Sequence, residues 1–230
     1  MRSTSNLHPL IVAIGGFSSE VGKTTLLCDL LPVFQGWEAI KVTRGHYRSC
    51  GKDPQSCCVS GLLSDKPLIR SGYVQTFSAG KDTGRFWEAG AANVHWLIAT
   101  DSQIEEGIKQ ALDKVTGPGV FVEGNSFTEF VAIDFMIMVA PAAGGKIKAS
   151  ARKALTKSSS FFLSNLAKGA LPTDPRLETD DDCKATKLSF AAWCEKGLLR
   201  EKGRDLPIYV QQDLPRLVSE IRRRCMAAPR

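Results

Sequence analysis

The sequence lacks several features that mark specialised classes of protein. No apolar run approaches the roughly 20 residues that a membrane-spanning helix requires, so we expect no membrane partner. Internal repeats and low-complexity tracts are also missing. Lysine and arginine (30 residues) exceed aspartate and glutamate (24 residues) by only 6 charges. Because aromatic residues do not interleave the basic ones, this mild excess predicts no nucleic-acid partner.

The cysteines do not form a disulfide pattern. There are 7 of them, scattered along the chain, and no Cys-x2-Cys pair occurs. The N-terminal segment also lacks the pattern of a secretory signal peptide. We therefore expect reduced thiols and a cytoplasmic protein.

What the sequence does contain is an alternation of apolar runs and helical patterns. The apolar runs predict strands at 10–14, 38–42, 94–99, 120–123, 135–140, 160–164 and 207–210. The helical patterns span 23–33, 102–114, 148–155, 180–199 and 214–224. Runs that are apolar on both faces are typical of parallel strands covered by helices on each side. We predict one α/β domain over residues 1–230, with a three-layer fold and its functional groups at the carboxyl ends of the strands.

One stretch, at about 44–79, interrupts this alternation. It shows little periodicity and holds three of the cysteines. An irregular segment of this length inside a compact domain is usually functional or mobile. We therefore interpret it as an inserted loop.

The strongest motif lies between the first predicted strand and the first predicted helix, and it reads Gly15-Gly16-Phe17-Ser18-Ser19-Glu20-Val21-Gly22-Lys23-Thr24-Thr25. Glycines let backbone N–H groups turn inward, and a helix N-terminus adds partial positive charge, so this setting predicts a phosphate-binding loop. Lys23 is expected to reach the β and γ phosphates, the Thr24 hydroxyl to ligand Mg²⁺, and Thr25 to bond the α phosphate. The remaining nucleotide contacts are assigned to Gly16, Ser18, Ser19, Glu20, Val21 and Gly22.

A carboxylate is expected to complete the Mg²⁺ site. The apolar run 120–123 ends in Glu123, which is followed by a glycine. A carboxylate at the carboxyl end of a strand beside the phosphate loop can hold Mg²⁺ directly or through water. The sequence therefore predicts a three-layer P-loop NTPase fold in which Thr24 and Glu123 bind Mg²⁺ and Lys23 binds GTP or ATP.

Two segments carry a resemblance to known families. Five residues separate Gly16 from Gly22 where four are common, and in this the loop resembles the Walker A loop of dethiobiotin synthetase, an ATP-dependent ligase. The segment Gly80-Lys81-Asp82-Thr83-Gly84-Arg85-Phe86-Trp87-Glu88-Ala89-Gly90-Ala91 resembles the Gly-Lys-Asp-Ser…Arg…Glu-Ala-Gly-Ala segment of the molybdopterin-guanine dinucleotide biosynthesis protein B family. The matches extend from residue 10 to about residue 140, a little over half of the chain.

The second resemblance implies a Mg²⁺-dependent NTPase with slow turnover, GTP favoured, that works with a protein partner in molybdenum-cofactor maturation. It implies that Asp82 positions metal or water and that the stretch 44–79 acts as a switch. Whether the protein is a monomer or a homodimer is left open. That family has a His-rich segment after its second strand, whereas this chain keeps Lys41 and a single histidine. Lys41 is expected either to face a phosphate or carboxylate or to be a surface lysine.

Two other functions stay open at the level of sequence. One is a dethiobiotin-synthetase-like ligase with a small carboxylate substrate, although Asn125-Ser126-Phe127 replaces the glycine-rich continuation of that family. The other is a non-catalytic, nucleotide-gated adaptor or metallochaperone. The sequence contains no base-recognition motif that would distinguish ATP from GTP. Asn165 and Gln211 are the candidates for contacts with the nucleotide base.

The inserted loop also suggests a soft-metal site. His46, Cys50, Cys57 and Cys58 supply three thiols and an imidazole, which is a ligand set that suits Zn²⁺ or another soft metal. Their spacing matches no common zinc motif, and unrelated loop cysteines are the alternative. Cys28 and His95 are expected to be packing residues.

Overall fold

The computed structural model describes residues 9–45, 60–164, 179–196 and 206–227. The described strands form one sheet in the order β3-β4-β2-β5-β1-β6-β7-β8. These strands are β1 (Leu10–Gly16), β2 (Glu38–Arg44), β3 (Leu68–Ser71), β4 (Val94–Ala99), β5 (Gly119–Glu123), β6 (Phe135–Pro141), β7 (Ser160–Ser164) and β8 (Ile208–Tyr209). All neighbours are parallel except β3, which runs antiparallel to β4 at the edge of the sheet.

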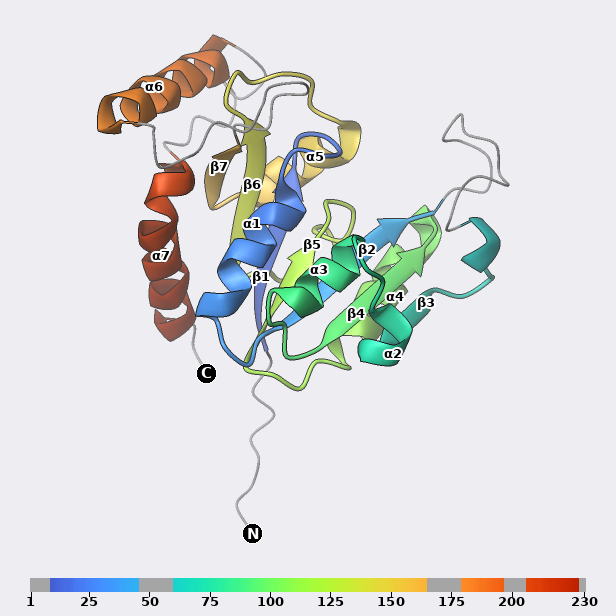
Figure 1. Ribbon diagram of the computed structural model, residues 1–230. Coiled ribbons are helices and arrows are strands. Elements are labelled where there is room, and N and C mark those ends of the chain that lie inside the picture. The colour runs from blue at the N-terminus through green and yellow to red at the C-terminus, as the bar shows by residue number, and fades with distance from the viewer. Residues whose placement is uncertain (1–8, 46–59, 165–178, 197–205, 228–230) are drawn as a thin grey trace.

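Helices cover both faces of this sheet (Figure 1). They are α1 (Lys23–Leu30), α2 (Tyr73–Thr76), α3 (Asp82–Glu88), α4 (Ile104–Leu112), α5 (Ala149–Ala154), α6 (Asp180–Lys196) and α7 (Leu214–Ala227), with short 3₁₀ turns η1 (Leu31–Val33), η2 (Ser60–Leu62), η3 (Asp101–Gln103), η4 (Leu155–Lys157) and η7 (Gln211–Asp213). Side chains of α1, α3 and α7 pack on one face, and those of α4, α5 and α6 on the other. The predicted α/β fold, a mostly parallel sheet between two helical layers, is confirmed.

The two-residue period of a strand explains how one sheet serves two cores. In β1, Val12 and Ile14 face the α1 side while Ala13 faces the α4 side, and all three are fully buried. Because the strands are buried on both faces, they appear in the sequence as continuous apolar runs. None of the described helices has the length and hydropathy needed to cross a membrane.

The predicted ends of the first strand and of the first helix were wrong. We predicted that the first strand ends at Ile14, but β1 continues through Gly15 and Gly16, which pair with β6. We predicted a helix over 23–33, but α1 ends at Leu30 and a 3₁₀ turn containing Pro32 follows. Proline has no N–H to donate and cannot continue an α-helix.

The stretch at about 44–79 is not irregular throughout. Its described part contains β3 and the one-turn helix α2. A four-residue strand at the edge of a sheet is too short to show a period in sequence, which is the reason that pattern analysis missed it. Residues 46–59 of this stretch lie outside the described residues.

Candidate functional site

The loop between β1 and α1 lies at the carboxyl edge of the sheet. Gly22, which precedes α1, has a φ of 97°, a left-handed conformation that glycine adopts without steric cost. Glu20 takes the same region with a φ of 58°, which is rare for a residue with a Cβ. Within the described part of the chain, no side chain caps the first turn of α1. The N–H groups of that turn are therefore available to an anion.

The loop is held from the side by β7 and α6. Phe17 is fully buried, with its ring centroid 6.2 Å from those of Phe161 and Phe190 and 5.9 Å from that of Trp193. The Ser164 hydroxyl donates to the carbonyl of Val21 across 2.7 Å. Aromatic contacts of this kind add about 0.5–1.5 kcal/mol each beyond burial, so the loop is fixed before any ligand arrives.

Asn125 fixes the start of the loop. Its side-chain oxygen accepts from the N–H of Gly16 at 2.9 Å, and its side-chain amide donates to the carbonyl of Gly16 at 2.8 Å. One side chain thus satisfies both backbone groups where β1 leaves the sheet. Sequence analysis assigned no role to Asn125, because its partner lies 109 positions away and no local pattern marks the pair.

Strand register gathers the charged residues beneath α1 and α3. Lys41 of β2 and Glu123 of β5 are Cα partners in the parallel ladder. They lie two positions beyond Ala39 and Phe121, whose side chains face α1 and α3, so they share that face. Asp82 opens α3 on the same side.

These groups are in direct contact. The Thr24 hydroxyl donates to Glu123 Oε2 at 2.8 Å, and Lys41 Nζ lies 2.5 Å from Glu123 Oε1. Lys41 also forms an ion pair with Asp82. Glu123 is almost fully buried, and its charge is balanced by this lysine. The structure thus brings together Lys23, Thr24, Glu123 and Asp82, and it excludes the interpretation of Lys41 as a surface lysine.

Burial and neighbouring charges set the protonation of this cluster. Burial lowers the pKa of Lys41, but the carboxylates of Glu123 and Asp82 outweigh burial, so its pKa is raised. Burial raises the pKa of Asp82, but Lys41 and a hydrogen bond with Thr24 outweigh burial, so its pKa is lowered. The pKa of Lys23 is lowered, chiefly because the side chain is buried. Lys41 and Asp82 are therefore an ionised pair at neutral pH.

Lys23 folds back over the loop. Its Nζ donates to the carbonyl of Ser18 at 3.0 Å. A phosphate oxygen carries negative charge and attracts this ammonium group more strongly than a neutral carbonyl oxygen does, so a phosphate can replace the carbonyl of Ser18. This placement agrees with the phosphate-binding role expected of Lys23.

The segment 80–91 packs directly on α1. The Arg85 side chain donates to the Thr25 hydroxyl at 3.3 Å, and the carbonyl of Arg85 accepts from the Cys28 thiol at 3.6 Å. At Gly84, a Cβ atom would lie 2.1 Å from the carbonyl oxygen of Ser78. The glycine is therefore required for α3 to approach this turn and to bring Asp82 to the cluster.

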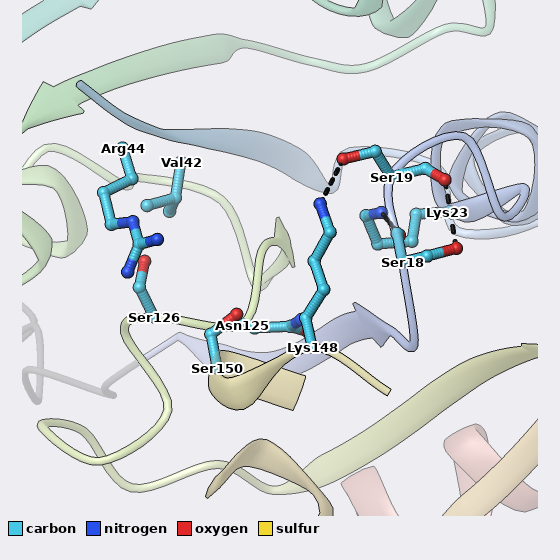
Figure 2. A pocket seen from close by; sticks show the side chains of 9 residues that line it. All are labelled: Ser18, Ser19, Lys23, Val42, Arg44, Asn125, Ser126, Lys148 and Ser150. Atoms are coloured by element: carbon cyan, nitrogen blue, oxygen red, sulfur yellow. Dashed lines mark hydrogen bonds between the residues drawn. The ribbon is translucent and has the colours of Figure 1, made fainter. Parts of the chain in front are cut away.

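A pocket of about 280 Å³ opens beside the loop (Figure 2). Its lining comes from the loop, the end of β2, the segment after β5 and the start of α5, and consists of Ser18, Ser19, Lys23, Val42, Arg44, Asn125, Ser126, Lys148 and Ser150. Lys148 Nζ lies 2.5 Å from the Ser19 hydroxyl. No local motif marks Arg44, Ser126, Lys148 and Ser150, which become neighbours only when the fold brings them to one cavity.

Gln211, a predicted base contact, does not join this group. Gln211 donates to the Asp29 carboxylate on α1 at 3.1 Å and does not line the pocket. Asn165, His46, Cys50, Cys57 and Cys58 lie outside the described residues, so base recognition by Asn165 and the Zn²⁺ site stay predictions. Among the described residues, no group of three or more His, Cys, Asp or Glu side chains is placed to hold a metal ion.

Comparisons with known proteins place the chain in no family. No protein-family model matches it, and no curated protein does. Among solved structures, LpxK from Aquifex aeolicus in complex with ATP has a TM-score of 0.42 and 18% identity over 73% of this chain. This chain spans 52% of LpxK, about half of its length. A protein described as a plasmid partition protein, from Borrelia burgdorferi B31 and bound to AMPPNP, has a TM-score of 0.37 and 14% identity over 92% of this chain and 89% of its own.

Proposed function

We propose that the protein is a Mg²⁺-dependent nucleotide-binding protein that hydrolyses a nucleoside triphosphate slowly. The observation that carries the proposal is the contact of 2.8 Å between the Thr24 hydroxyl and Glu123 Oε2, directly beneath the uncapped start of α1 and next to Lys23. A hydroxyl and carboxylates are oxygen ligands of the kind that Mg²⁺ prefers. The hydroxyl of Thr24 and the carboxylate of Glu123 therefore fit this ion.

In this function the protein acts mainly by positioning and charge. The N–H groups of the loop and Lys23 bind the β and γ phosphates. Thr24 and Glu123 would hold Mg²⁺, which supplies positive charge to the phosphates when it is bound. Asp82, ionised through its pair with Lys41, orients the attacking water by accepting a hydrogen bond.

The finer form of the proposal is a GTPase similar to the molybdopterin-guanine dinucleotide biosynthesis protein B family, acting with a protein partner in cofactor maturation. It is supported by the contacts that segment 80–91 makes with α1 through Arg85 and with Lys41 through Asp82. ATP in place of GTP stays open. An ATP-dependent ligase is the second candidate, because the pocket continues from Lys23 to Arg44, beyond the phosphate-binding loop.

Calorimetric titration of ATP and GTP, each with and without Mg²⁺, tests the proposal. We expect Mg²⁺-dependent binding of at least one nucleotide, and a loss of about 10- to 100-fold in affinity for Lys23→Ala, because a hydrogen bond to a charged group contributes about 1.5–3 kcal/mol. Lys153→Ala is the matched control, since Lys153 is exposed and pairs with Glu129 on the surface. Undiminished affinity in Lys23→Ala would refute the proposed function.

A further inference from the structure

The pocket beside the phosphate-binding loop has the chemistry of an anion site. Its lining contributes three cations, from Lys23, Arg44 and Lys148, together with serine hydroxyls and the amide of Asn125. None of the nine lining residues, all of them within the described part of the chain, carries a carboxylate. Three cations around one cavity repel one another until an anion enters.

Alternation along β2 separates this pocket from the carboxylate cluster. Lys41 lies on the face covered by α1 and α3, where it contacts Glu123 and Asp82. Val42 packs on the opposite face, and Arg44, two residues further, shares that face with it. Arg44 is therefore not a member of the cluster that we assign to Mg²⁺.

The cations of the pocket are also separated from one another. Figure 2 shows Lys23 and Arg44 at opposite ends of the pocket, with Lys148 between them. Lys23 belongs to the phosphate-binding loop. The Arg44 end is lined by β2 and by the segment after β5, outside that loop.

The present partners of Arg44 and Lys148 are weak. Arg44 lies 3.2 Å from Asp101, and both side chains are exposed, so this ion pair contributes at most about 1 kcal/mol. Lys148 contacts the neutral hydroxyl of Ser19. Lys148 and Lys23 line the same pocket, so their like charges repel each other. An anion between these cations would relieve that repulsion.

We propose that Arg44 and Lys148 form a second anion-binding subsite, which takes the carboxylate or phosphate group of a small second substrate beside the γ phosphate. The inference rests on the proposed function, because it assigns the Lys23 end of the pocket to the nucleotide. A guanidinium binds a carboxylate or phosphate with two parallel hydrogen bonds, and a lysine adds a point charge. Ser126 and Ser150 supply hydroxyls for the remaining oxygens.

The test is a two-stage calorimetric titration. The protein is first saturated with Mg²⁺ and a non-hydrolysable triphosphate analogue, AMPPNP or GMPPNP, so that the γ-phosphate position is filled. Inorganic phosphate and succinate are then titrated in separate arms, which distinguishes the two anion chemistries. We expect saturable binding of at least one of them. Arg44→Gln and Lys148→Gln should each weaken it by about tenfold, the effect of losing a charge-assisted bond, and should leave the affinity for the analogue within about threefold.

Lys153→Gln is the matched control, because Lys153 lies on α5 but outside the lining and should change neither affinity. The inference is overturned if neither anion binds the loaded wild-type protein. It is overturned equally if the two variants bind the anion with the affinity of the wild type. It is also overturned if their affinity for the analogue falls as much as their affinity for the anion, because Arg44 and Lys148 would then be nucleotide ligands. Failure of the analogue to bind the wild type is seen in the first stage, and it contradicts the proposed function itself.

Discussion

Lys41 Nζ lies 2.5 Å from Glu123 Oε1, and this ion pair joins two neighbouring strands at the mouth of the phosphate-binding loop. The same ammonium group pairs with Asp82. Lys41 thus neutralises Glu123, which we assign to the Mg²⁺ site, and Asp82, which we assign to the attacking water. A cation that binds at Glu123 has to compete with Lys41 or displace it.

This competition leads to a prediction for Lys41→Met. Without the ammonium group, Glu123 and Asp82 attract a divalent cation without competition, so we expect Mn²⁺, used as a probe for Mg²⁺, to bind the nucleotide-free variant at least about tenfold more tightly than the wild type. Calorimetry or the paramagnetic signal of free Mn²⁺ measures the change. Lys153→Met should leave Mn²⁺ affinity unchanged. Equal Mn²⁺ affinity in wild type and Lys41→Met would show that Glu123 is not part of the metal site.

Asn125 is expected to be critical for the stability of the loop. Asn125→Ala removes both hydrogen bonds to Gly16 and leaves an N–H and a carbonyl group unpaired, which costs about 1–3 kcal/mol. Denaturation by urea measures the loss. Gln110→Ala removes an exposed amide that donates to Glu106 within the same helix, and it should change the free energy of unfolding by less than about 0.5 kcal/mol. If both variants are equally stable, Asn125 does not hold the loop.

We predict that a side chain at position 84, in place of Gly84, lowers the stability of the protein. In Gly84→Ala the new Cβ would meet the carbonyl oxygen of Ser78 at 2.1 Å, so α3 has to shift, at a cost of about 1–3 kcal/mol. Thermal unfolding provides the measurement. Gly61→Ala is the matched change, because a Cβ there meets no described atom within 4 Å. A melting temperature for Gly84→Ala equal to that of Gly61→Ala would contradict the packing that brings Asp82 to the site.

Glu38, at the amino end of β2, makes the stability of the protein depend on pH. It lies 2.7 Å from His95 Nε2, and its other oxygen accepts from Thr116 and Gly117. Burial raises the pKa of Glu38, but the hydrogen bonds from His95, Thr116 and Gly117 outweigh burial and lower the pKa from 4.5 to about 2. Because the folded pKa lies below the unfolded one, the stabilisation is fully present above pH 4.5 and is lost as the pH falls toward 2.

A comparison with Glu38→Gln isolates this contribution. Both proteins share every other titrating carboxylate, so we expect the wild type to be more stable at pH 7 and the difference to shrink between pH 4.5 and about 2. Denaturation by urea at several pH values measures both curves. Glu129→Gln removes an exposed carboxylate, so its stability should change with pH as that of the wild type does. A difference between wild type and Glu38→Gln that stays constant over this range would contradict the assignment.

The sequence was sufficient for the architecture and for the position of the loop. Apolar runs without alternation predicted buried parallel strands, and the glycines followed by Lys23 and Thr24 predicted the loop, because both signals depend on residues close together in the chain. The short edge strand β3 and the true end of α1 were not predicted, since neither has a local period long enough to detect.

Tertiary structure alone decided which polar residues act together. Lys41 had two interpretations in the sequence, and only the register between β2 and β5 places it on Glu123. His95 was predicted to be a packing residue, and it is buried in β4, but its contact of 2.7 Å with Glu38 had no signal in the sequence. Arg44 and Lys148 are 104 positions apart and carry no motif, yet they line one pocket. Contacts of this kind follow from strand order and side-chain alternation, which are properties of the assembled sheet. The glycine-containing loop between β1 and α1 depends on residues close together in the chain, so the sequence by itself specifies it.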